Sequence, residues 1–408
     1  MSHAAPALHD GHQIALLQGS QEFFAALIQA MDEAVREVRL ETYIFDFTAS
    51  GADVAEALMR AAQRGVATQL IVDGLGTGPI PPAWAQRFAD AGVQWRVYAP
   101  SSTLGLLIPG RWRRLHRKLC SIDGRIAFCG GINILDDFFD PNHGTLTSPR
   151  FDFAVRVTGP LVEEARGTMA QLWLRMQAVR DLKRRQLSAA VDAFRAAGRE
   201  QQPAPKPAAG PAAPPHFVRA ALVLRDNIRH RARIERAYRK AISAARHEVI
   251  IANAYFVPGR KMRRALEKAA QRNVKVVLLL QGKYEYFMQY YASRPIYGAL
   301  LRAGVEIHEY SPSFLHAKVA VVDGRWATVG SSNLDPLSML LAREANVVLE
   351  DTEFAAGLRG RLMEAIREGG QRMDAAHFEN RPVSERFKER IALVLMRLAL
   401  MLHGKEYL

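Results

Sequence analysis

Apolar and polar positions in the N-terminal part of the chain switch between helical and strand-like periods. A helical pattern ends near residue 37 and leads into an apolar, β-branched run at residues 38–45. A second helical pattern ends near residue 65, and a short apolar run follows at residues 69–72. Helices of 10–15 residues that alternate with strands predict an α/β sandwich.

The same order of elements returns about 210 residues later. Helical patterns end near residues 247 and 273, and strand-like runs follow them at residues 248–257 and 274–280. Residues 198–216 separate the two parts and are rich in Pro and Ala, which is typical of an extended linker. We therefore predict a first domain at residues 1–197, this linker, and a second domain at residues 217–408.

The repeat is closest where residues 115–133 align without a gap with residues 315–333. Each copy holds the pattern H-x-K-x4-D, and the Asp-Gly that ends it is a strong turn signal between two β-branched runs. Each copy is therefore predicted to form a β-hairpin. Because side chains alternate along a strand, the His and Lys of one copy share a face.

Packing of the two halves about a pseudo-two-fold axis would bring both His-Lys faces into one cleft, a geometry that suits displacement at a phosphodiester. One imidazole attacks phosphorus while the other, protonated, delivers a proton to the leaving alkoxide. The lysines stabilise the charge on phosphate oxygens without a metal, so we expect no metal and no cofactor. The candidate catalytic residues are His116, Lys118, Asp123, His316, Lys318 and Asp323.

Further polar and small residues follow each hairpin. Glycine and serine at the strand ends allow close approach of a ligand, and the asparagines are neutral hydrogen-bond donors. The candidate phosphate-binding residues are Gly131, Asn133, Ser331 and Asn333. The two histidines need opposite protonation states, so each needs its own orienting partner. Asp152 and Glu344 lie in similar contexts downstream of the hairpins and are candidates for that role.

Composition narrows the class of partner. The chain has 408 residues, of which 49% are hydrophobic, as expected for a globular protein. Its formal net charge of +14 favours a polyanionic partner. Two cysteines exclude a disulfide scaffold, and packing is the favoured interpretation of Cys120 and Cys129, with redox control as the alternative. Neither a signal peptide nor a membrane span is evident, which predicts peripheral membrane contact at most.

Two apolar segments leave alternatives open. Residues 104–109 precede Arg111, Arg113, Arg114 and Arg117, which predicts either a solvated loop or a loop that inserts into a membrane and pairs arginines with anionic headgroups. Residues 387–402 mix basic and apolar positions and predict either a buried helix or an interfacial amphipathic anchor.

Paired H-x-K-x4-D motifs followed by G-[GS]-x-N resemble the phospholipase D superfamily, and residues 253–258 and 314–338 are similar to bacterial cardiolipin synthases, most of all the short B-type branch. The resemblance implies two repeats, each a mixed β-sheet flanked by helices, packed as a pseudo-two-fold internal dimer.

The resemblance also implies residue roles. A phosphatidyl-histidine intermediate would form, with His116 favoured as the nucleophile, while Asp123 and Asp323 hold the hairpins and Asp152 and Glu344 orient the histidines. Relatives often carry Asn two residues before this glutamate, where this chain has Ala342.

The substrates implied by the resemblance are anionic phospholipids, with phosphatidylglycerol as donor, at the cytoplasmic face of the bacterial inner membrane. Headgroup exchange or phospholipid hydrolysis is the nearest alternative. A nuclease is less favoured, because the simple nucleases of the superfamily carry a single motif and this chain has no stacking platform, so no nucleic-acid partner is expected. A basic binding scaffold without activity is a third candidate. The sequence leaves the oligomeric state open, since the duplication already supplies an internal pseudo-dimer.

Overall fold

The computed structural model describes residues 6–100, 113–140, 143–183, 192–193, 195–196, 217–225, 232–283, 287–335, 342–379 and 382–401. The predicted linker at residues 198–216 and the apolar run at residues 104–109 lie outside these ranges.

The first half alternates strands and helices as the apolar pattern predicts, with the added hairpin strands. Its elements are β1 (His9–Gln18), α1 (Gly19–Asp32), β2 (Glu37–Thr42), α2 (Ala49–Gln63), β3 (Ala67–Asp73), α3 (Pro82–Ala91), β4 (Gln94–Tyr98), β5 (Arg114–Leu115), β6 (Lys118–Ile122), β7 (Ile126–Gly130), β8 (Phe139–Asp140), β9 (Gly144–Thr145), β10 (Phe153–Thr158) and α4 (Leu161–Lys183).

The second half repeats this plan and adds C-terminal helices. Its elements are β11 (Val218–Arg225), α6 (Arg233–Ala244), β12 (Glu248–Asn253), α7 (Arg260–Gln271), β13 (Lys275–Gln281), α8 (Phe287–Arg302), β14 (Glu306–Tyr310), β15 (Lys318–Val322), β16 (Trp326–Gly330), β17 (Ala342–Glu350), α10 (Thr352–Gly369), β18 (Gly370–Arg372), α11 (Ala375–Glu379) and α12 (Val383–Met401).

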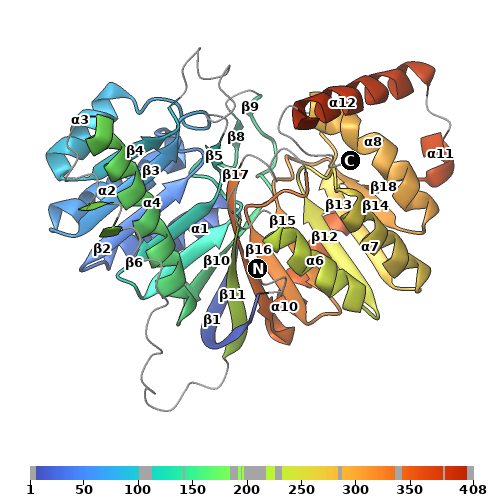
Figure 1. The fold of residues 1–408 in the computed structure, drawn as a ribbon, viewed down its shortest axis with the longest axis horizontal. Helices are drawn as coiled ribbons and strands as arrows, with labels where there is room; N and C mark the ends of the chain where they lie inside the picture. Colours follow the sequence, from blue (N-terminus) through green and yellow to red (C-terminus); the bar gives the residue numbers. More distant parts are fainter. Residues whose placement is uncertain are drawn as a thin grey trace.

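The strands of both halves form one continuous mixed sheet. Its order is β18-β14-β13-β12-β15-β16-β17-β11-β1-β10-β7-β6-β2-β3-β4, with β5 paired to β17. The outer strands β2-β3-β4 and β12-β13-β14 are parallel, and the hairpin strands are antiparallel. The halves meet where β1 and β11 pair antiparallel, so they lie side by side about this seam (Figure 1). The mixed-sheet, pseudo-two-fold architecture expected from the sequence is confirmed.

The three largest of the four apolar clusters among the described residues lie between the sheet and its helices. Helices α1, α2 and α3 cover the outer face of the first half, and α6, α7 and α8 cover that of the second. The third core is shared, because Val155 and Leu119 of the first half pack in one cluster with Val319 and Val347 of the second, under α4 and α10. At about 25 cal/mol per Å² of buried apolar area, a core built from both halves fixes their relative position.

Both cysteines lie in these cores. Cys120 packs in the outer core of the first half and Cys129 in the shared core, and burial raises the pKa of both thiols. A thiol that resists ionisation is a poor redox group. Packing is therefore the interpretation that the structure supports.

The C-terminal segment forms the helix α12, which packs along α8 (Figure 1). Phe387 and Val394 are 63% and 52% exposed, so the buried-helix alternative is wrong at these positions. Among the described residues, no helix is both long enough and apolar enough to cross a bilayer.

Candidate active site

The motif aspartates form the turns of the two hairpins and fasten them to the sheet. Asp123 and Asp323 adopt positive φ angles of 54° and 50°, a conformation that Asp and Asn tolerate better than most residues. The Asp123 carboxylate accepts backbone N–H bonds from Val35, Arg36 and Glu37, at 2.8–3.0 Å. The Asp323 carboxylate binds the three equivalent N–H groups, those of Arg246, His247 and Glu248.

Each histidine is paired with a carboxylate from the other half of the molecule. The Nδ1 atom of His116 lies 3.0 Å from Oε1 of Glu344, and Nδ1 of His316 lies 2.6 Å from Oδ2 of Asp152. The sequence indicated both carboxylates but not this exchange between halves. With Nδ1 engaged, each ring leaves Nε2 for a substrate.

Short backbone pairings enforce the exchange. β5, which leads into His116, pairs in parallel with β17, and the His116 N–H donates to the Arg343 carbonyl at 3.1 Å. In the mirror arrangement, Leu315 bridges Phe151, and the His316 N–H donates to the Phe151 carbonyl at 2.9 Å. Each histidine therefore lies beside the strand that carries the other half's carboxylate.

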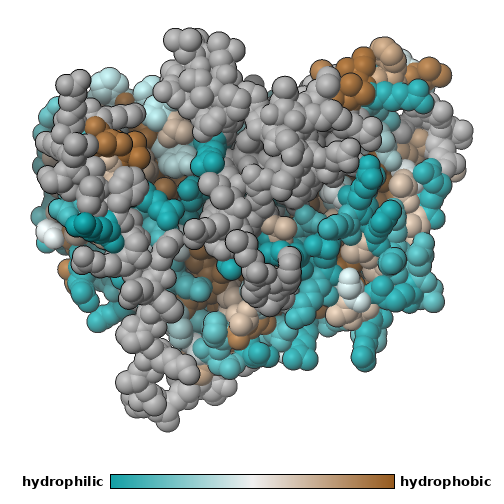
Figure 2. Space-filling model, viewed as in Figure 1, coloured by the Kyte–Doolittle hydropathy of each residue, from teal (hydrophilic) through white to brown (hydrophobic). Residues whose placement is uncertain are grey.

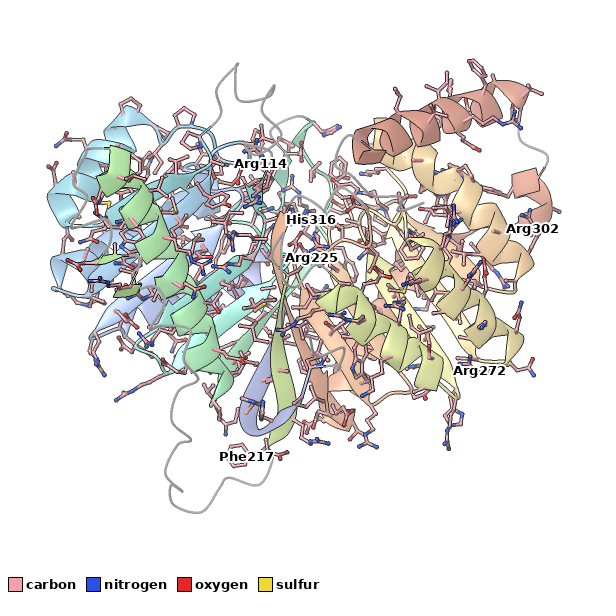
Figure 3. The ribbon with its side chains drawn as sticks, in the orientation of Figure 1. Arg114, Phe217, Arg225, Arg272, Arg302 and His316 are labelled. Atoms are coloured by element: carbon pink, nitrogen blue, oxygen red, sulfur yellow. The ribbon has the colours of Figure 1, made fainter. Side chains whose placement is uncertain are left out.

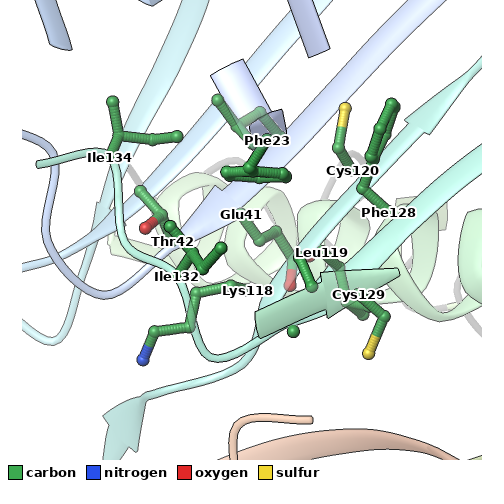
Figure 4. Close-up of a pocket in the computed structure, with 13 residues that line it drawn as sticks. Phe23, Glu41, Thr42, Lys118, Leu119, Cys120, Phe128, Cys129, Ile132 and Ile134 are labelled. Atoms are coloured by element: carbon green, nitrogen blue, oxygen red, sulfur yellow. The ribbon is translucent and has the colours of Figure 1, made fainter. Parts of the chain in front are cut away.

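The motif lysines are buried against the same backbone. The Nζ atom of Lys118 donates to the carbonyl of His116 at 2.8 Å, and Nζ of Lys318 donates to the carbonyl of His316. Burial, together with the charge of Lys318, lowers the pKa of Lys118 to about 7. Figure 4 shows the Lys118 stem beside an apolar pocket, with its ammonium pointing away from Phe128 and Cys120. A lysine so desolvated gains strongly from an anionic ligand.

The two histidine–carboxylate pairs differ in their surroundings. Arg225, the last residue of β11, lies 3.3 Å from Oε1 of Glu344, the oxygen nearest His116, and the Ser331 hydroxyl donates to Oε2. Burial would raise the pKa of Glu344, but His116 and Arg225 outweigh it and hold that pKa below its usual range. The ionised form of Glu344 is therefore favoured beside His116. Figure 3 labels Arg225 and His316, both near the middle of the molecule.

The Asp152–His316 pair is more weakly ionised than the Glu344–His116 pair. Burial raises the pKa of Asp152 to about 6, although Lys318 opposes the shift. Burial also lowers the pKa of His316 well below its ordinary value, and the charges of Lys318 and Lys118 act in the same direction. Gly131 faces this carboxylate so closely that a Cβ would lie 2.3 Å from Oδ1 of Asp152. Glycine at 131 thus makes room for Asp152, whereas Ser331 binds Glu344.

The two predicted asparagines are both buried near the hairpin ends. The Asn133 Oδ1 atom accepts the N–H of Ile44 at 3.2 Å, which fixes the orientation of the amide. Within the described ranges, Oδ1 of Asn333 has no hydrogen-bond partner. A buried amide atom without a partner is costly unless a ligand or water satisfies it. Their role in phosphate binding stays a prediction.

The basic residues around the first motif are not all at the surface. Arg117 is buried in an ion pair with Glu41, with Nε 2.5 Å from Oε2, and Arg114 lies 3.9 Å from Asp73 and donates to the Ala99 carbonyl. The expectation of headgroup binding is wrong for Arg117, because its ion pair is buried inside the fold; for Arg114, which is part-buried, it stays a prediction. Arg111 lies outside the described residues, and Arg113 is exposed.

Three residues that position the site were not singled out from the sequence. The Asp73 carboxylate accepts the Leu115 N–H at 2.8 Å, and in the second half Gln281 accepts the Leu315 N–H at 3.3 Å. Both residues end equivalent strands before a glycine, a signal present in the repeat. Arg225 is the third, and the repeat gives no signal for it, because Gly19 holds the corresponding position beside Asp152.

The structure brings two imidazoles and two ammonium groups together, close enough for the charges of Lys318, Lys118 and His116 to act on His316. The hairpins on one continuous sheet, with paired H-x-K-x4-D motifs, define a protein of the phospholipase D type. The sequence pattern described as "Cardiolipin synthase, PLD-like domain" matches residues 27–148 and 238–365. The chain belongs to this cardiolipin synthase family.

Individual relatives agree with that assignment. Cardiolipin synthase B of Escherichia coli K12 is 37% identical over 367 residues, which cover 90% of this chain and 83% of the relative. Cardiolipin synthase of Geobacillus sp. WCH70 is 28% identical over 430 residues, covering 97% of this chain and 76% of the relative. The solved structure of phosphatidylserine synthase from Haemophilus influenzae Rd KW20 shares the fold, with a TM-score of 0.66 at 12% identity over 95% of this chain and 93% of that one.

Proposed function

We propose that this protein is a cardiolipin synthase-type phosphatidyltransferase, which moves a phosphatidyl group from phosphatidylglycerol to the hydroxyl of a second phospholipid. The observation that carries the proposal is the crossed pairing of His116 with Glu344 and of His316 with Asp152 in one site. Double displacement at phosphorus needs two imidazoles in opposite protonation states, and separate carboxylate partners allow the two rings to differ.

In the first step, Nε2 of the nucleophilic histidine attacks phosphorus, and the bond from phosphorus to the headgroup oxygen breaks. The second histidine gives its proton to the departing alkoxide, which leaves as glycerol. In the second step the acceptor hydroxyl attacks phosphorus, its proton passes to the second histidine, and the P–N bond breaks. Lys118 and Lys318 offset the charge on the non-bridging phosphate oxygens throughout.

We assign the nucleophile to His116. An N-phosphorylated imidazole carries positive charge, and the carboxylate of Glu344, whose pKa His116 and Arg225 lower, neutralises it. Asp152 has a pKa raised by burial to about 6, so its pair with His316 holds and releases a proton near neutral pH. The assignment agrees with the role implied by the sequence resemblance.

The activity is tested by incubating the purified protein with phosphatidylglycerol vesicles and separating the lipids. Wild type should form cardiolipin and glycerol, and His116→Ala and His316→Ala should each abolish the product. Degradation of added DNA without cardiolipin would replace the proposal by a nuclease. Release of phosphatidic acid alone would replace it by a phospholipase.

The roles of the histidines are tested with a phosphatidyl ester of p-nitrophenol, whose leaving group needs no acid. His316→Ala should accumulate a phosphatidyl adduct on residue 116, detectable by mass spectrometry of peptides. His116→Ala should give no adduct. An adduct on His316 in His116→Ala would reverse the assignment.

The substrates place the protein at a membrane surface. We propose that it acts peripherally at the cytoplasmic face of the bacterial inner membrane, where anionic phospholipids are its partners. Fractionation of cells by high salt or carbonate washes tests this: the protein should leave the membrane fraction without detergent.

A further inference from the structure

The helix α12 presents an apolar face that nothing among the described residues covers. The side of the helix toward α8 carries the buried residues Glu389 and Ala392. At 100° per residue, the opposite side carries Val383, Phe387, Ile391, Val394 and Leu395, all exposed. We call these five residues the α12 face. Figure 2 shows it as an apolar surface at the upper right.

Basic positions flank the α12 face on both sides. Lys388 lies on one flank and Arg390 on the other, and both are exposed. An apolar stripe between cations is typical of a helix that lies in the interface of an anionic bilayer.

The α12 face lies at the end of the molecule where the active-site segments gather. Strands β5 and β8 are at this end, whereas Phe217 is at the opposite end (Figures 1 and 3). Phe138 and Phe139, at β8, are exposed apolar side chains at the same end. A surface that binds at this end would therefore bring lipids toward the two hairpins.

We propose that the α12 face, together with Phe138 and Phe139, docks on the surface of an anionic phospholipid bilayer. The inference rests on the proposed function only for the nature of the substrate. A second copy of the chain fits this face less well, because a two-fold contact between two such helices would bring their basic flanks together. Burial of aromatic and aliphatic side chains in the interface supplies affinity, and the cations select anionic lipid.

The test measures binding of the full-length protein to vesicles of phosphatidylcholine with and without a quarter of phosphatidylglycerol. The triple variant Phe387→Ser, Ile391→Ser, Leu395→Ser should bind the anionic vesicles at least tenfold more weakly than wild type. The charge reversal Lys388→Glu, Arg390→Glu should weaken binding to anionic vesicles at least fivefold and reduce its salt dependence. The matched control Val35→Ser, Phe217→Ser changes exposed apolar residues away from the α12 face and should bind as wild type does.

Activity in two lipid forms separates docking from catalysis. On phosphatidylglycerol dispersed in detergent micelles, the triple variant should keep wild-type activity and its melting temperature, while its activity on vesicles falls in parallel with binding. Unchanged vesicle binding in both α12 variants overturns the proposal. If, in addition, wild type is a dimer and the triple variant a monomer, the face is a contact between copies instead. Vesicle binding that depends on α12 in a protein without transferase activity would support docking and refute the proposed function.

Discussion

Arg225 makes the two histidines of the site chemically unlike. Both rings bind a carboxylate through Nδ1, but the carboxylate that Arg225 contacts is Glu344, at 3.3 Å. It does not reach the reacting atoms, so it is a positioning residue that acts through Glu344. Removal of one partner from a buried charged network leaves the rest uncompensated, which costs more than the pair itself contributes.

We therefore expect Arg225→Met to lower kcat about 10- to 100-fold, as loss of a residue that orients a reacting group does elsewhere. The pKa of Glu344 should rise, so the acid limb of the kcat profile should move to higher pH. Arg225→Lys should restore most of the rate, because it keeps the charge. The control is Arg219→Met on the same strand, whose exposed pair with Glu350 has no link to the site. Equal losses in both methionine variants would contradict the role.

The pH dependence of the free enzyme follows from two buried groups. Activity should rise as His116, whose pKa burial lowers, loses the proton that blocks its attack, and it should fall as Lys118, whose pKa burial lowers to about 7, loses its own. The profile of kcat/KM should therefore be a narrow bell between these two titrations. Bound phosphate favours the charged lysine, so the alkaline limb of kcat should lie at higher pH.

Lys118→Arg checks the assignment of the alkaline limb. Arginine does not deprotonate in the accessible range, so this limb should disappear from the kcat/KM profile. Lys275→Arg, on the half-exposed edge of β13, should leave the profile unchanged. An unaltered alkaline limb in Lys118→Arg would assign the titration to another group.

The functional importance of a residue could be predicted where the same residue recurs in both halves of the repeat. The motif histidines, lysines and aspartates recur at one offset, so their importance could be derived from the chain alone. Arg225 could not be found in that way, because its counterpart is Gly19. The burial of Arg117 was also missed, since its partner Glu41 lies 76 residues earlier on β2.

At the scale of elements, the motif aspartate holds its hairpin rather than moving protons. We expect Asp123→Asn to lower the free energy of unfolding by about 2 kcal/mol, since three backbone N–H groups lose an ionised acceptor. Asparagine tolerates the positive φ angle, so backbone strain adds little. Asp323→Asn should behave alike, and folded protein should keep its activity within about twofold. Denaturant unfolding measures the loss.

The pH dependence of stability distinguishes this structural role of Asp123 from a role in proton transfer. Burial would raise the pKa of Asp123, but the N–H groups of Glu37 and Val35 outweigh it and lower that pKa. A depressed pKa stabilises the folded state above the unfolded pKa of about 3.9, and the contribution disappears as pH falls through the folded value. The difference between wild type and Asp123→Asn should therefore shrink in acid. Asp32→Asn, at an exposed pair with Arg60, should change stability by less than about 0.5 kcal/mol.

Most elements were predictable because their apolar periods are long and recur in both halves. The strand expected at residues 38–45 ends earlier, at Thr42, where the chain leaves the sheet and Ile44 binds Asn133. The two-residue strand β5 was not predictable, because so short a run has no period. Its pairing with β17 depends on a partner more than 200 residues away.

At the scale of the whole molecule, the halves are joined by the shared core and by the β1–β11 pairing rather than by the linker alone. We expect a protease site inserted within residues 198–216 to be cut without loss of phosphatidyl transfer, and the nicked halves should co-elute in size exclusion. Residues 1–197 expressed alone should be inactive, because His116 then lacks Glu344. Activity in that fragment, or separation of the nicked halves, would contradict the arrangement.

The pseudo-dimer was predictable from the internal repeat, but the exchange of carboxylates was not. Asp152 and Glu344 each follow the hairpin of their own half in sequence, and nothing in that order reveals that each turns toward the other half. The exchange arises from the packing of β17 beside β5 and of Phe151 beside Leu315. These contacts are decided by tertiary structure and leave no periodic trace.

The exchange also has a consequence for synthesis of the chain. When the first half of a growing chain has emerged from the ribosome, it contains His116, Lys118 and Asp152. His116 still has no carboxylate partner, because Glu344 lies on β17 and is made later. The active site is therefore complete only late in synthesis, when β17 has paired with β5. We therefore expect incomplete chains to be inactive on membrane lipid, because His116 still lacks Glu344.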